Sequence, residues 1–257
     1  MQVDLNADMG EGFGDWTMGD DAALLDVVTS ANIACGAHAG DWDVMARTMA
    51  RARDKGVGIG AHPGFPDLQG FGRRRMTFDS ESLGNLIIWQ FGAARAMATS
   101  LGAGVRHFKL HGALANMVSE DATLARAAYS AALRVDPDVI LLVLAGTAQQ
   151  ATAEELGAQW AGEIFADRGY NDDATLVSRG QPGAMVHDPG EAAQRMVQFV
   201  KSGAIHANSG RQIPAACDSI CLHGDGPEAV AIARAVRAAL QAEGITLRQM
   251  AGRGPKA

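Results

Sequence analysis

The sequence predicts an α/β fold, an irregular (β/α) barrel of about seven to eight mostly parallel strands. Two observations support this prediction. Short apolar segments alternate with helical stretches along the chain, and such alternation builds right-handed βαβ units around a parallel sheet. Polar residues beside glycine follow nearly every apolar segment. This pattern favours a closed barrel, whose strand ends all face one central site, over an open sheet with its site at a switch point.

The first two strands are expected at the motifs that begin with Asp4 and Ser30. Asp41 can then cap a helix that Gly56 ends, because Asp is favoured at helix starts and Gly just beyond helix ends. The residues at helical spacing in this segment are Val44, Met45, Thr48, Met49 and Ala52.

A longer helix is expected from about Ser80 to near Gly102, between strands at 57–59 and 105–108. Its apolar face comprises Leu83, Leu86, Ile87, Phe91 and Ala94. Further strands are predicted at Val139–Leu144, Gly162–Phe165, Ser219–Leu222 and Ile245–Leu247, and further helices near 121–134, 191–202 and 227–243. A length of 257 residues suits a single domain over residues 1–257.

Composition indicates a protein that acts on a small molecule. The net charge of −7 provides no positive field for nucleic acid or an anionic membrane. The apolar run Val139–Ala145 is too short to span a membrane, and the N-terminal residues lack the pattern of a secretion signal. Three cysteines without CxxC spacing argue against disulfides and fit a reducing cytoplasm. A cytoplasmic enzyme without a nucleic-acid or membrane partner is therefore expected.

The motif from Asp4 to Glu11 carries the first candidate site residues. Asp8 and Glu11, close to Asn6, could bind a divalent cation, activate water or hold a substrate amine. A solvated turn would need the glycines of this motif, but it would not need two acids beside Asn6. We therefore predict that at least one of the two acids is catalytic and that Asn6 binds substrate.

Two histidines follow successive predicted strands in glycine-rich turns. A single histidine is usually structural, but His38 and His62 could converge with Asp8 or Glu11 as metal ligands or acid/base groups. The set Asp8, His38 and His62 is the predicted metal triad, although no HExxH or CxxC motif points to zinc. Cys35 could act as a nucleophile near His38, but a buried packing role explains it equally well.

Lys109 and His111 share the parity of one strand face, so they could converge on one developing negative charge. An ion pair inside the barrel is the structural alternative. His107 has the same parity but is expected to lie deeper, in a structural role. Arg73, after the glycine-rich segment 68–72, is expected to clamp phosphate or carboxylate, unless its charge run is simply solvated.

The segment His223–Pro227 follows an apolar strand and begins a predicted helix, whose free amides could receive an anion. His223 and Asp225 are therefore predicted to lie at the site. Asn32 and Asp41, in the second strand motif, are likewise predicted to bind substrate or phosphate. No GxxxxGK[ST] loop occurs in the chain.

Six segments together resemble the LamB/YcsF family. They are Asp4–Glu11, Ser30–Asp41, Gly60–Arg74, Lys109–Asn116, Glu163–Arg168 and Ser219–Pro227. The resemblance implies a β/α barrel of the glycoside hydrolase/deacetylase type. It also implies ATP-dependent opening of 5-oxoproline to L-glutamate, with ATP and Mg²⁺ as cosubstrate and two partner subunits, B and C. Departures from the usual family pattern occur at Ala7, Ala37, Leu110 and Ala115.

Two other functions fit the same residues. One is a stand-alone amidohydrolase or deacetylase that uses a divalent metal on Asp8, His38 and His62 and needs no ATP. The other is a regulatory protein that binds a carbohydrate or amino acid without turnover. The concentration of acids and imidazoles favours catalysis.

Overall fold

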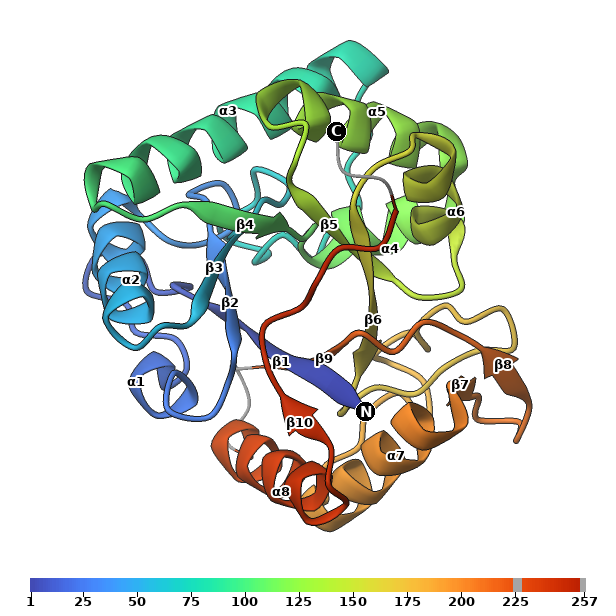
Figure 1. The fold of residues 1–257 in the computed structure, drawn as a ribbon. Coiled ribbons are helices and arrows are strands. Elements are labelled where there is room, and N and C mark those ends of the chain that lie inside the picture. Colours follow the sequence, from blue (N-terminus) through green and yellow to red (C-terminus); the bar gives the residue numbers. More distant parts are fainter. Residues whose placement is uncertain (224–227, 255–257) are drawn as a thin grey trace.

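The computed structural model describes residues 1–223 and 228–254. Seven parallel strands close a barrel, because the last of them pairs with both its predecessor and the first (Figure 1). The barrel strands are β1 (Gln2–Met9), β2 (Ser30–Ala34), β3 (Gly58–His62), β4 (Val105–Phe108), β5 (Ile140–Leu144), β6 (Trp160–Phe165) and β9 (Ser219–Leu222). The predicted α/β barrel is confirmed.

Helices surround the barrel on its outside (Figure 1). They are α1 (Asp21–Leu24), α2 (Trp42–Asp54), α3 (Ser80–Ser100), α4 (Gly112–Glu120), α5 (Ala122–Val135), α6 (Ala148–Glu155), α7 (Pro189–Ser202) and α8 (Ala229–Ala242). The predicted helices correspond to α2, α3, α5, α7 and α8, whereas α1, α4 and α6 were not predicted. These three helices are short, with at most 9 residues each. None of the helices in the described ranges is long and apolar enough to cross a membrane.

Strand β10 (Thr246–Leu247) corresponds to the eighth predicted strand, but it is not part of the closed barrel. It pairs with the start of β1, at Gln2 and Val3. An antiparallel pair, β7 (Ala204–His206) and β8 (Gln212–Pro214), was not predicted from the sequence. Both additions lie outside the barrel wall (Figure 1).

The period of two along β1 sends polar side chains inward and apolar ones outward. Leu5, Ala7 and Met9 belong to the hydrophobic core, and Asp4 and Asn6 form hydrogen bonds across the barrel interior. Asp4 accepts from Ser30 and Ser219, on the two strands that flank β1, and Asn6 donates to Ser219 at 2.7 Å. The barrel interior is therefore a hydrogen-bonded polar layer.

A histidine fills the next interior position. His107 contacts Oδ1 of Asn32 through its Nε2 atom at 2.7 Å, and Asn32 donates to Asn6 at 2.7 Å. A Cβ atom at Gly60 would lie only 2.0 Å from the His107 ring, so glycine is required there. His107 has the structural role that was predicted for it, as part of the floor below the strand ends.

Candidate active site

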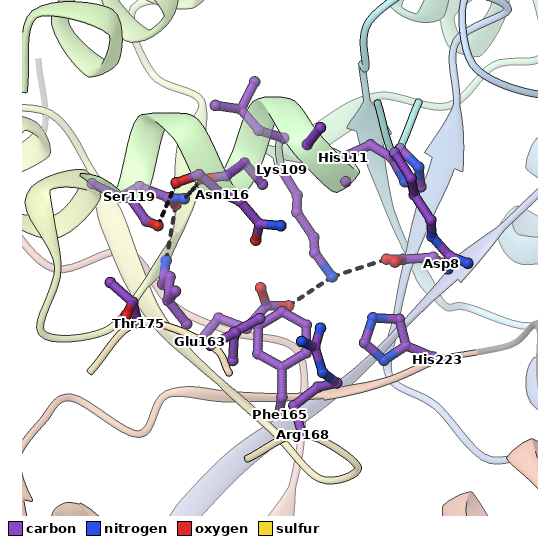
Figure 2. A pocket seen from close by; sticks show the side chains of 18 of the residues that line it. Asp8, Lys109, His111, Asn116, Ser119, Glu163, Phe165, Arg168, Thr175 and His223 are labelled. Atoms are coloured by element: carbon purple, nitrogen blue, oxygen red, sulfur yellow. Dashed lines mark hydrogen bonds and ion pairs between the residues drawn. The ribbon is translucent and has the colours of Figure 1, made fainter. Parts of the chain in front are cut away.

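A cavity of about 330 Å³ opens at the carboxyl ends of the barrel strands. Figure 2 shows charged side chains from several strand ends pointing into it. The ionisable residues along its wall include Asp8, Glu11, His62, Lys109, His111, Glu163, Arg168 and His223. Concave sites that gather titratable groups from several loops are the usual location of activity in such barrels.

Lys109 occupies the floor of this cavity between two carboxylates (Figure 2). Its Nζ atom lies 2.9 Å from Asp8 Oδ1 and 2.8 Å from Glu163 Oε1. The side chain is buried, and burial alone would lower its pKa. Asp8, Cys221 and Glu163 outweigh burial and raise the pKa of Lys109 well above its usual value. The ammonium therefore stays charged.

Asp8 is held as an anion by the groups around it. Burial acts to raise its pKa, but His62 and Lys109 hold that pKa well below the usual value. Its Oδ1 atom also accepts a hydrogen bond from Asn32 at 2.8 Å, and its Oδ2 atom lies 3.4 Å from His62 Nε2. A buried, ionised carboxylate of this kind can orient a water molecule or a cation.

Three imidazoles and a carboxylate form a buried cluster beside Asp8. The ring of His38 stacks on that of His111 with centroids 3.7 Å apart, and His62 meets both rings edge-on. Neither ring nitrogen of His38 forms a hydrogen bond with any described residue. Glu11 Oε1 lies 3.8 Å from His38 Nε2 and 3.7 Å from His111 Nδ1. One ligand atom from each of these four residues fits within 4.8 Å of the others, so the cluster could hold a metal ion.

Two arginines also line the cavity. Arg168 is only 5% exposed and donates to two carbonyls, of Val177 at 2.6 Å and of Ala184 at 3.2 Å. Burial, together with Arg179, lowers the pKa of Arg168 to about 10. Arg73 lies over the Phe71 ring at 4.9 Å and lines the same cavity. An anionic group would be favoured beside these guanidinium groups.

His223, on the cavity wall, forms a pair with Asp167. Its Nδ1 atom lies 2.8 Å from both carboxylate oxygens, and its ring stacks on Phe165. Burial would raise the pKa of Asp167, but His223 and Arg168 lower it. An ionised carboxylate that fixes an imidazole is the arrangement used to orient an acid/base histidine.

The family model for LamB/YcsF matches residues 3–254 of this chain. The chain belongs to the LamB/YcsF family. It is 62% identical over 246 residues to a protein of Ruegeria pomeroyi that is named as the A subunit of 5-oxoprolinase, covering 96% of this chain and 97% of that relative. A second protein of that name, from Azorhizobium caulinodans, is 49% identical and covers 95% and 97%.

Solved structures support the same family and fold. The lactam utilization protein from Thermus thermophilus superposes with a TM-score of 0.91 at 39% identity, over 96% of this chain and 99% of that one. A peptidoglycan N-acetylglucosamine deacetylase domain from Eubacterium rectale superposes with a TM-score of 0.52 at 11% identity, over 99% and 90%. That second likeness concerns the fold alone, a deacetylase-like β/α barrel.

The LamB/YcsF barrel brings together the six residues predicted to be catalytic. Asp8, Glu11, His62, Lys109 and His111 line the cavity, and His38 lies directly behind them. Lys109 and His111 have different partners within this cavity, however. Strand β4 ends at Phe108 and His111 stands at the N-cap position of α4, so the strand parity assumed for the pair does not extend to them. Lys109 turns to Asp8, and His111 turns to His62.

Several residues that were predicted to bind substrate or phosphate do not line the cavity of this LamB/YcsF protein. Asn6 and Asn32 lie below the cavity, where their amides bind other side chains. Asp41 caps α2 by accepting hydrogen bonds from the backbone amides of residues 43 and 44, and the amide of Gly14 also donates to it. Arg73 and His223 do line the cavity, and Asp225 lies outside the described residues. Burial raises the pKa of Cys35 to about 12, which argues against a nucleophilic role.

Sequence reasoning missed Glu163, Asp167 and Arg168 as site residues. Glu163 had a usable signal, because it is a charged residue inside the apolar segment Trp160–Phe165. A carboxylate within a buried strand needs a partner, and Lys109 provides it. For Asp167 and Arg168, the spacing of residues in the neighbouring sequence did not indicate a place at the cavity.

Proposed function

We propose that this LamB/YcsF protein is the A subunit of a 5-oxoprolinase, which opens the lactam 5-oxoproline (pyroglutamate) to L-glutamate with hydrolysis of ATP. One observation carries the proposal: a relative named as the A subunit of 5-oxoprolinase is 62% identical over nearly the whole of both chains. The Thermus relative at 39% identity is named for lactam utilization. A buried lysine between two carboxylates, in a cavity of small-molecule size, suits the chemistry of an amide.

The proposal includes partner subunits and ATP with Mg²⁺. The relatives are named as one subunit of an enzyme, and the sequence has no P-loop motif. We therefore assign at least part of ATP binding to partner subunits B and C. A cytoplasmic location remains the expectation from the sequence, and the three cysteines are free thiols.

The need for ATP follows from the substrate. An unstrained five-membered lactam is a poor electrophile, and its nitrogen is a poor leaving group. Phosphorylation of the amide oxygen would activate the carbonyl carbon towards water. Water then adds to that carbon, the C–N bond breaks with protonation of the nitrogen, and a second water molecule releases phosphate from the remaining acyl phosphate to give L-glutamate. The Lys109 ammonium is suited to stabilise the oxyanion that forms when water adds, because it is fixed and shielded from bulk water.

Three further groups have roles in this proposal. The ionised Asp8 carboxylate orients the attacking water through the hydrogen bonds that it can accept. His223, positioned by Asp167, donates a proton to the departing lactam nitrogen. Arg168 binds the carboxylate of 5-oxoproline, because it is a buried cation on the cavity wall that forms no ion pair with a described acid.

Glutamate release from 5-oxoproline tests the proposal. It should be measured with and without ATP, for the purified chain alone and after addition of subunits B and C from the same genome. Activity that needs both ATP and the partners is expected. Absence of glutamate from a well-folded three-subunit complex would exclude 5-oxoproline as the substrate. Binding of 5-oxoproline without turnover would instead favour a regulatory protein.

A stand-alone amidohydrolase is the second candidate, because the cluster of Glu11, His38, His62 and His111 could hold a metal ion. Hydrolysis of an amide or acetyl group by the isolated chain, without ATP, would favour this candidate. The metal would then supply Lewis-acid activation of the substrate carbonyl or of water.

A further inference from the structure

Two buried imidazoles face each other through nitrogens that both carry lone pairs. His62 Nδ1 lies 3.0 Å from the carbonyl oxygen of Lys109, and His111 Nε2 lies 2.8 Å from that of Phe71. A carbonyl oxygen only accepts, so each ring must donate its proton there. In the neutral rings, His62 Nε2 and His111 Nδ1 are therefore unprotonated, and they lie 3.0 Å apart. Two lone pairs at this distance repel unless a proton or a cation lies between them.

A shared proton would not account for the third ring. His38 is fully buried, and neither of its ring nitrogens has a hydrogen-bond partner among the described residues. Its Nε2 atom lies 3.8 Å from the Glu11 carboxylate, which is also 3.7 Å from His111 Nδ1. A cation among these groups would be a partner for the two facing nitrogens, and also for His38 once its ring turns from the stack on His111.

We propose that Glu11, His38, His62 and His111 form a resident site for a divalent transition-metal ion, with Zn²⁺ as the best match. Their ligand atoms all fall within 4.8 Å of one another. Metal–nitrogen bonds of about 2.0–2.1 Å require the cluster to contract and one of the stacked rings, His38 or His111, to turn so that its nitrogen lone pair points at the ion. Imidazole nitrogen favours zinc and its neighbours, whereas Mg²⁺ and Ca²⁺ prefer sites built from oxygen. The site is thus distinct from the Mg²⁺ that accompanies ATP.

Two features around the cluster support a metal site. The carbonyls of Lys109 and Phe71 fix the tautomers of His62 and His111, as groups behind metal-binding histidines commonly do. Glu11, His62 and His111 also line the cavity, so one side of the site faces substrate. A zinc ion bound there would lower the pKa of a water molecule or polarise a carbonyl. The inference does not depend on which amide is the substrate.

Metal content of the full-length isolated chain tests the site without any activity assay. The chain should be purified without chelators and its zinc measured by mass spectrometry, then stripped with dipicolinate and titrated with Co²⁺. We expect one ion per chain and visible Co²⁺ absorption bands that Zn²⁺ displaces. His62→Gln and His111→Gln should each weaken Co²⁺ binding by more than about 100-fold. That is the largest loss usually seen when a residue that hydrogen-bonds to a metal ligand is replaced, and removal of a ligand itself should cost more. The exposed His187 offers a matched control, since His187→Gln should bind as the wild type does.

Circular dichroism of each stripped variant separates loss of the site from loss of the fold. If a histidine variant does not fold, Glu11→Gln provides the same test at the carboxylate. A wild-type chain that purifies without metal and gives no Co²⁺ bands would overturn the proposal. Unchanged Co²⁺ affinity in the folded variants would also overturn it. Failure of the 5-oxoprolinase assay would leave this outcome unaffected, because no substrate is involved.

Discussion

Lys109 donates to Asp8 at 2.9 Å across the barrel, although the two residues are 101 positions apart in the chain. Glu163 lies on the other side of the same ammonium at 2.8 Å. The fold therefore depends on a charge balance at the floor of the cavity, and a change at Lys109 should affect stability and catalysis together.

Lys109→Met tests this coupling. Loss of the ammonium leaves two buried carboxylates without their cation, which should lower the free energy of unfolding by about 3–5 kcal/mol. Loss of one group that stabilises an oxyanion should also reduce kcat by about 10²–10³. Urea unfolding and glutamate release by the complex measure the two effects. Lys201→Met is the control, because Lys201 pairs with Glu243 on the surface and should contribute only about 0–1 kcal/mol.

Arg168→Gln tests recognition of the substrate carboxylate. A charged hydrogen bond contributes about 1.5–3 kcal/mol, so KM for 5-oxoproline should rise by about 10- to 100-fold. Affinity for 2-pyrrolidinone, a lactam without a carboxylate, should hardly change when measured by competition. Arg95→Gln is the control, since Arg95 pairs with Asp136 on the outside of α3. If Arg168→Gln weakened the binding of both lactams equally, Arg168 would maintain the shape of the cavity and would not bind the substrate carboxylate.

Asp167→Asn tests the pair formed with His223. The amide keeps the shape of the carboxylate but no longer stabilises a charged imidazole, so kcat should fall by about 10²–10⁴ while KM changes little. The double variant with His223→Gln should be hardly slower than His223→Gln alone, because the two residues act as a unit. Additive effects on kcat would show that they act separately.

The barrel could be predicted because its signals are local. Alternation of apolar segments and helices, and the polar residues after each strand, are visible within short stretches of sequence. The first strand was correctly expected at the motif that begins with Asp4, and Asp41 was correctly expected to cap a helix.

The site could be predicted only in part, because its geometry depends on long-range contacts. Strand parity suggested that Lys109 and His111 act on one point, yet the chain turns into α4 after β4, and within the same cavity the two side chains contact different partners. Arg168 was missed because its importance depends on a loop whose carbonyls, at Val177 and Ala184, fix its guanidinium. The spacing of residues in the sequence does not indicate which carbonyls will lie beside this guanidinium in the fold.

His107 should make the protein less stable as pH falls. Burial, and then the charge of Lys109, lower the pKa of His107 to about 3, below its usual value near 6.5. Between these values the unfolded chain binds a proton that the folded chain does not, so stability is lost as pH falls below about 6.5. This histidine alone contributes a slope of about 1.4 kcal/mol per pH unit.

Urea unfolding between pH 4 and pH 7 measures this slope. His107→Gln should flatten the dependence, because glutamine cannot take up the proton but can still donate to Asn32. His187→Gln is the matched control. Because His187 is exposed, its replacement should leave the slope of unfolding free energy against pH unchanged. A wild-type slope retained in His107→Gln would show that other groups govern acid sensitivity.

Asp41→Ala separates helix capping from ligand binding at a residue for which both were predicted. The carboxylate accepts hydrogen bonds from backbone amides at residues 43 and 44, at 2.8 Å each, and it does not line the cavity. Its loss should lower the free energy of unfolding by about 1 kcal/mol. KM values for 5-oxoproline and ATP should stay unchanged. Asp41→Asn should retain most of the stability, because asparagine caps helices nearly as well. A raised KM in the folded alanine variant would mean that Asp41 contacts a ligand after all, in a conformation of the α2 start that differs from this one.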